Sequence, residues 1–198
     1  MHISEGVLSP PVLATGWALA AAGLAAGLKK TQTERLPETA LVSAALFLAS
    51  LVHVPLGPSS IHLTLLGLAG ILLGWSAVPA LFVALLLQGI LFQFGGLLSL
   101  GVNTAVMGTA ALAGSGVYRL ALPLARPGLR FLPAFAAGFT AVIAGTVLVC
   151  LALFFSDNEL RATAALLFAA NLPLAAVEGV ISAFIVAFLS KTVPQYVS

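Results

Sequence analysis

The sequence predicts an all-α integral membrane protein, a bundle of about seven transmembrane helices. Two observations predict this class: 61% of the 198 residues are hydrophobic with a mean hydropathy of +1.15, and only 7% are charged. A soluble domain carries about 25% charged residues, so this chain has too little polar surface to cover a fold in water. At about 20 residues per span, the chain has room for about seven helices and no separate soluble domain. We therefore expect residues 1–198 to form a single transmembrane domain.

Polar breaks and helix-breaking residues predict the ends of the helices. Pro10 begins the first helix with Ser9 as its N-cap, and Lys29-Lys30 ends it. The run over residues 54–60 contains two prolines and a glycine, and it cannot continue a helix. The expected helices cover residues 9–28, 38–53, 61–75, 78–94, 101–122, 128–155 and 161–190, the last with a kink at Pro173.

Basic residues predict the orientation. If the spans alternate, only Arg161 lies on one side, and the positive-inside rule makes the other side cytoplasmic. We therefore expect the N-terminus outside and the C-terminus in the cytoplasm, in a multi-pass protein of the cell (inner) membrane. The positive charges follow the first apolar run, so we expect no cleaved signal peptide and a mature chain that keeps Met1. The residues assigned to the cytoplasmic side are Lys29, Lys30, Arg35, Arg119, Arg126, Arg130 and Lys191.

All three histidines, His2, His53 and His62, fall on the outer side in this topology. His53 closes the second expected helix and His62 opens the third. Each of these helices has about 15 residues, or about 23 Å of length, short of a hydrocarbon core of about 30 Å. Irregular backbone at membrane depth is tolerated only where it faces protein or a water-filled cavity. We therefore expect residues 54–60 to form a re-entrant outer loop, a feature typical of transporter binding sites.

The start of the chain has a metal chemistry of its own. The Met1 α-amine, the His2 backbone nitrogen and His2 Nδ1 can close fused chelate rings around one ion, with three nitrogens in a plane. Deprotonation of a backbone amide favours Ni(II) or Cu(II) over Zn(II). A histidine of the outer loop is then a candidate for the fourth ligand. Residues 1–8 are thus interpreted as a metal-chelating N-terminal leader.

Other polar residues in the apolar chain are supporting candidates. Gln93 and Asn103 flank the expected outer loop, where they either line the site or bond between helices. His53 is interpreted as an interfacial imidazole or one that supports a ligand. Glu178 is the one acid deep within an expected span, and we expect it to pair with polar groups of the fourth or fifth helix or to serve in coupling. Glu5 is either a carboxylate ligand or a residue of the leader turn at Gly6.

Two motifs that would indicate an enzyme are missing from the sequence. There is no G-x-x-x-x-G-K-[ST] loop for ATP and no H-E-x-x-H, and the single Cys150 fits a core-filling role. We therefore expect a transport component that has no resident cofactor. Two alternatives stay open. One is a zinc-dependent membrane enzyme that uses His2, His53, His62 and Glu5, and the other is a stand-alone metal channel or carrier.

Several motifs resemble the cobalt/nickel substrate-binding membrane subunits of energy-coupling factor (ECF) ABC importers, the CbiM/NikM family. The first is the leader MHISEGVLSP over residues 1–10, and the second is PLGPSSIHL over residues 55–63. A third runs from Gln88 through Gly108 and includes Gly95-Gly96, and the last combines residues 172–175 with Glu178-Gly179. The resemblance covers nearly the whole chain.

The resemblance implies a set of ligands and partners. It implies that the Met1 amine, the His2 amide and imidazole nitrogens, and His62 hold the transported Co2+ or Ni2+. It also implies seven helices, a transmembrane coupling (T) subunit, two ATPase subunits and often a small auxiliary membrane subunit. The family usually has asparagine at His53 and glycine or alanine at Ile61, which leaves the role of His53 open. Square-planar ligation by nitrogen favours nickel, whereas sequences of this type are commonly tied to cobalt for cobalamin biosynthesis.

Overall fold

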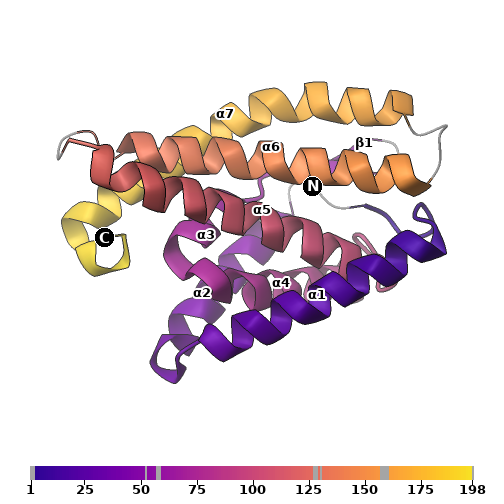
Figure 1. The fold of residues 1–198 in the computed structure, drawn as a ribbon, viewed down its shortest axis with the longest axis horizontal. Coiled ribbons are helices and arrows are strands. Elements are labelled where there is room, and N and C mark those ends of the chain that lie inside the picture. Colours follow the sequence, from indigo (N-terminus) through magenta and orange to yellow (C-terminus); the bar gives the residue numbers. More distant parts are fainter. Residues whose placement is uncertain are drawn as a thin grey trace.

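The computed structural model describes residues 3–51, 53–56, 59–126, 129, 131–156 and 161–197. In this part of the chain, α-helices and short 3-10 turns make up the fold, together with one two-stranded hairpin (Figure 1). The α-helices are α1 Pro10–Lys30, α2 Leu36–Ala49, α3 Leu66–Leu73, α4 Ala77–Phe92, α5 Leu100–Ala121, α6 Phe131–Ser156 and α7 Arg161–Thr192. The strands are β1 His53–Leu56 and β2 Ser59–His62, and the 3-10 turns that matter below are η1 Thr33–Arg35 and η2 Gly74–Ser76.

Helix α5 lies at the centre of the bundle. Helices α6 and α7 pack along each other on one side of it, and α1 and α4 lie on the other (Figure 1). Glycines of α5 let its neighbours approach closely, as small residues do at helix interfaces in membranes. Gly101 meets Trp17 of α1, and Gly108 meets Val78 of α4. Helices α1, α3, α4 and α6 thus pack directly on α5, whereas α7 packs on α6 and α2 packs on α4.

The structure confirms the membrane class predicted from composition. Five helical segments of the described residues are long and apolar enough to cross a membrane. Helix α2, with 14 residues, is not among them. The five segments are Pro10–Lys30, Leu66–Phe92, Leu100–Leu124, Phe131–Ser156 and Ala165–Thr192.

The segment between α2 and α3 differs from the prediction. The helix expected over residues 38–53 ends at Ala49, and the one expected over residues 61–75 begins only at Leu66. Between them, β1 and β2 form an antiparallel hairpin that sets His53 opposite His62. Pro55 has no backbone N–H for a helix, and Val54 and Ile61 are β-branched residues that favour extended backbone. Helical periodicity was therefore the wrong template for this short apolar run.

Gly74 reverses the chain between α3 and α4. It ends α3 with a φ of +56°, a left-handed conformation that glycine adopts without strain. The side chain of Arg119, near the end of α5, packs on Gly74, whereas α4 runs back and ends a short loop before Leu100. The apolar segment Leu66–Phe92 is therefore bent back on itself. Helix α3, at 8 residues, is about 12 Å long and spans only part of an apolar layer.

Close packing of α3 on α5 predicts that two Gly→Ala substitutions have different effects on the free energy of unfolding. A Cβ at Gly70 would collide with the Ala111 carbonyl oxygen, whereas a Cβ at Gly116 would meet nothing within 4 Å. Gly70→Ala should lower the free energy of unfolding by about 1–3 kcal/mol through overpacking. Gly116→Ala should leave it unchanged or raise it by up to about 1 kcal/mol through helix propensity. Thermal unfolding of the two purified variants in detergent measures this, and equal melting temperatures would contradict the packing described.

Candidate metal centre

The leader is fixed in the core at Ile3. Its backbone N–H donates to Asn103 Oδ1 over 2.8 Å, and its carbonyl accepts from Asn103 Nδ2 over 3.0 Å. Ile3 is 0% exposed and Asn103 is 3% exposed, so this one amide satisfies two buried backbone groups of residue 3. Asn103 Nδ2 also donates to Ser99 Oγ at 3.3 Å, which helps to hold the amide in this orientation. The residue directly after His2 is therefore anchored to α5.

Apolar packing holds the rest of the leader against three helices. Ile3 and Leu8 belong to one buried cluster with residues of α5, α6 and α7, among them Val102 and Leu153. Glu5 turns away from this cluster and lies against Gly96 in the loop between α4 and α5. Residues 3–8 thus fold back onto the bundle and do not extend from it.

His62, at the end of β2, is a buried histidine whose ring lies against a backbone carbonyl. The residue is 4% exposed, and Nδ1 lies 2.9 Å from the carbonyl oxygen of Leu63. A carbonyl only accepts, so Nδ1 carries the proton and donates it. The lone pair of the neutral ring is then on Nε2, the arrangement typical of histidines that bind metal through Nε2.

Glu178 holds the chain between His62 and α3. This carboxylate is 0% exposed, lies near the middle of α7 and accepts from the backbone N–H groups of Thr64 and Leu65. The Leu65 N–H lies 3.0 Å from Oε1 and 2.8 Å from Oε2. Leu65 has a left-handed φ of 52°, which is rare for a branched side chain and persists only where surrounding contacts enforce it. The expected pairing of Glu178 with the fourth or fifth helix is therefore wrong, because its partners are the residues before α3.

The leader and the strand that carries His62 both pack near α7. Ile3 shares its buried cluster with Ala175, which lies one turn before Glu178 on that helix. Strand β2, which carries His62, also contacts α7. The chain that follows His2 is thus held at the first turn of α5, and the chain that follows His62 is held near the middle of α7.

The remaining predicted site residues are distributed as follows. Met1, His2 and the side chain of His53 lie outside the described part of the chain. Gln93 is exposed at the end of α4, where its backbone takes a left-handed φ of 57°. Asn103, singled out from the sequence as a residue that lines the site or bonds between helices, bonds in the structure to the backbone of Ile3. No local signal in the sequence links Glu178 of α7 to residues 64 and 65.

Apolar helices around a buried imidazole and an anchored leader define a multi-pass membrane protein with a candidate site for a small cation. Residues 2–196 match the model of the CbiM family, described as "Cobalt uptake substrate-specific transmembrane region". The chain belongs to this family, whose members are named for cobalt and nickel transport.

Individual proteins agree with this assignment. The chain is 41% identical over 197 residues to a "Putative metal transport protein" of Haemophilus influenzae, covering 98% of this chain and 96% of that protein. It is 35% identical over 127 residues to the "Fused nickel transport protein NikMN" of Rhodobacter capsulatus, covering 61% of this chain and 37% of that longer protein. A crystal structure of a truncated transition metal transporter superposes with a TM-score of 0.79 at 28% identity, covering 97% of this chain and 99% of the other.

The clamp on Ile3 predicts that Asn103→Leu frees the leader. Leucine has a similar size but no polar atoms, so the buried N–H and C=O of Ile3 lose their partners, at a cost of about 1–3 kcal/mol for each unsatisfied group. Hydrogen–deuterium exchange over residues 3–8 should accelerate and the melting temperature should fall. The control is Gln93→Leu, which changes an exposed amide. Unchanged exchange of the leader in Asn103→Leu would contradict the clamp.

Proposed function

We propose that this chain captures divalent cobalt or nickel as the substrate-binding membrane component of an ECF-type ABC importer. The ligands in this proposal are the Met1 amine, the His2 backbone nitrogen and imidazole, and His62. One observation carries the proposal: Asn103 fixes Ile3 in the core, which restricts where the two residues before it can reach. The names of relatives in cobalt and nickel transport support the choice of ion.

The donor set fits a small, nitrogen-seeking ion. In the proposed site the leader supplies three nitrogens in one plane, and Nε2 of His62 completes the square. The tautomer of His62 supports this, because its Nδ1 proton is directed to the Leu63 carbonyl and away from the metal. Ni(II), and Co(II) to a lesser degree, tolerate such nitrogen ligation better than Zn(II) does.

In this proposal Asn103 and Glu178 are positioning residues. Neither is a metal ligand, but each holds a segment next to a ligand, through Ile3 in one case and through Thr64 and Leu65 in the other. The hairpin register sets the backbone of His53 directly opposite that of His62. We assign His53 to the surroundings of the metal and not to its ligands.

The transport cycle requires partners in this account. The chain has no ATP-binding loop, so two ATPase subunits and a T subunit would supply the energy and the coupling. The Rhodobacter relative is named as a fusion that joins two units in one polypeptide, which supports an additional auxiliary subunit. The distribution of Lys and Arg supports an outward N-terminus, a cytoplasmic C-terminus and re-entry of residues 54–60 from outside.

The proposed ligand set predicts three equivalent losses of transport. His2→Ala, His62→Ala and a single alanine added before Met1 should each abolish saturable uptake of radioactive nickel or cobalt by cells that express the complete transporter. The alanine extension moves the α-amine away from the chelate while it keeps every side chain. Gln93→Ala is the control and should transport normally. Wild-type uptake by His2→Ala or His62→Ala would disprove the ligand set, and equal uptake without the ATPases would favour a stand-alone carrier.

The clamp by Glu178 predicts a loss of metal affinity with partial rescue by a conservative change. Glu178→Ala leaves two backbone N–H groups without an acceptor, and loss of such supporting groups typically costs about 10- to 100-fold in metal affinity. Glu178→Gln keeps one acceptor oxygen and should lose less. Isothermal titration of the purified chain with Ni2+, alongside melting temperatures, separates affinity from folding. Unchanged affinity in a folded Glu178→Ala variant would contradict the positioning role.

A further inference from the structure

A polar pocket of about 310 Å3 lies at the end of the bundle where α1, α3 and α5 finish. Its walls come from elements far apart in the sequence, and cations and hydrogen-bonding groups dominate them. None of these residues takes part in the candidate metal centre. The polar residues that line the pocket, with the indole of Trp75, are Lys30, Gln32, Arg35, Trp75, Ser76 and Arg119.

The pocket carries an excess of positive charge. Arg35 is neutralised by Glu38, to which it donates from Nε over 2.9 Å and from Nη2 over 2.8 Å. Lys30 and Arg119 form no ion pair with a carboxylate in the part of the chain that the structure describes. Two uncompensated cations thus face one polar space.

The walls of the pocket are held in place before any ligand arrives. The Lys30 ammonium lies 4.3 Å from the centroid of the Trp75 ring, a cation–π distance. Thr31 Oγ1 donates to Ser76 Oγ over 2.9 Å, which ties the end of α1 to η2. The guanidinium of Arg119 packs on Gly74, where a side chain would displace it. Such preorganisation reduces the entropy that binding would cost.

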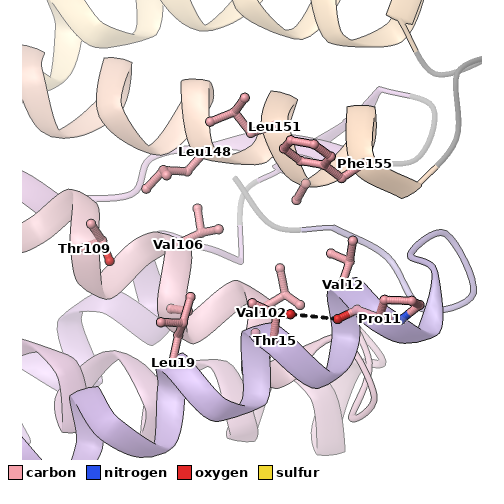
Figure 2. Close-up of a pocket in the computed structure, with 13 residues that line it drawn as sticks. Pro11, Val12, Thr15, Leu19, Val102, Val106, Thr109, Leu148, Leu151 and Phe155 are labelled. Atoms are coloured by element: carbon pink, nitrogen blue, oxygen red, sulfur yellow. Dashed lines mark hydrogen bonds between the residues drawn. The ribbon is translucent and has the colours of Figure 1, made fainter.

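An apolar groove leads away from this pocket along α1 and α5. Trp75 lines both the polar pocket and a space of about 280 Å3 between α1, α4 and α5. That space shares Leu19, Ala105 and Thr109 with a further space of about 440 Å3 between α1, α5 and α6. Figure 2 shows apolar side chains of these three helices, such as Val106, around the latter space. The apolar spaces along α1 and α5 thus adjoin the basic pocket at Trp75.

We propose that the pocket and groove together bind an anionic glycerophospholipid, with its phosphate between Lys30 and Arg119 and an acyl chain along α1 and α5. Basic pockets between transmembrane helices, near a cluster of lysines, are typical sites for anionic headgroups. An acidic side chain of a partner protein would satisfy the cations but would leave the groove unused. The apolar spaces that adjoin the cationic pocket at Trp75 favour the lipid, because a lipid uses both the charge and the apolar surface.

Native mass spectrometry of the full chain in detergent tests the proposal, with phosphatidylglycerol and phosphatidylcholine of equal chain length as probes. The wild type should retain phosphatidylglycerol preferentially. Lys30→Gln combined with Arg119→Gln should weaken its retention by roughly tenfold or more, given about 1 kcal/mol for each interfacial cation. The matched control is Lys29→Gln combined with Lys191→Gln, two exposed cations that do not line the pocket.

A second pair of variants tests the acyl chain. Thr109→Phe fills the junction of the two apolar spaces, whereas Val147→Phe adds the same ring to an exposed position of α6 outside them. Thr109→Phe should lower retention of phosphatidylglycerol severalfold, and Val147→Phe should not. Equal retention of both lipids by the wild type, or no effect of the double cation variant, would overturn the proposal. Binding of glycerol phosphate as tight as that of the lipid would also overturn it. So would a double cation variant that still retains phosphatidylglycerol but no longer binds a partner subunit.

Discussion

The structure depends on how backbone N–H and C=O groups are satisfied where helix is interrupted inside an apolar molecule. A helix satisfies its own backbone, but the leader and the residues before α3 have no such internal partners. The side-chain amide of Asn103 forms hydrogen bonds with both the N–H and the C=O of Ile3. The carboxylate of Glu178 accepts hydrogen bonds from the N–H groups of Thr64 and Leu65. These two buried side chains allow irregular backbone to persist inside the bundle.

The candidate metal centre follows from this arrangement. A chelating N-terminus is useful only if its position is fixed relative to other ligands, because chain entropy otherwise opposes closure of the site. The amide of Asn103 fixes the leader one residue after His2, and the carboxylate of Glu178 fixes the chain two residues after His62. The same side chains thus serve folding and the proposed capture of metal.

The sequence predicted the long helices well, because their ends carry strong local signals. Pro10 and Lys29-Lys30 bracket α1 within two residues of its observed bounds, and the polar turn before Arg161 separates α6 from α7. The hairpin could not be predicted from periodicity, because each of its strands, His53–Leu56 and Ser59–His62, has only four residues, too few positions to distinguish a strand from a helix. The break expected between residues 61–75 and 78–94 lies at Gly74, one residue before the predicted end of the helix.

The site was predicted less completely than the fold, because its supporting contacts join residues about 100 positions apart. Resemblance identified the proposed ligands, but only three-dimensional packing connects α7 to the residues after His62. X-ray absorption spectroscopy of the Ni2+-loaded chain tests the central claim most directly. The account predicts four nitrogen ligands in a plane with scattering from two imidazoles, reduced to one imidazole in His62→Ala. A tetrahedral or oxygen-rich shell, or a spectrum unchanged by His62→Ala, would contradict it.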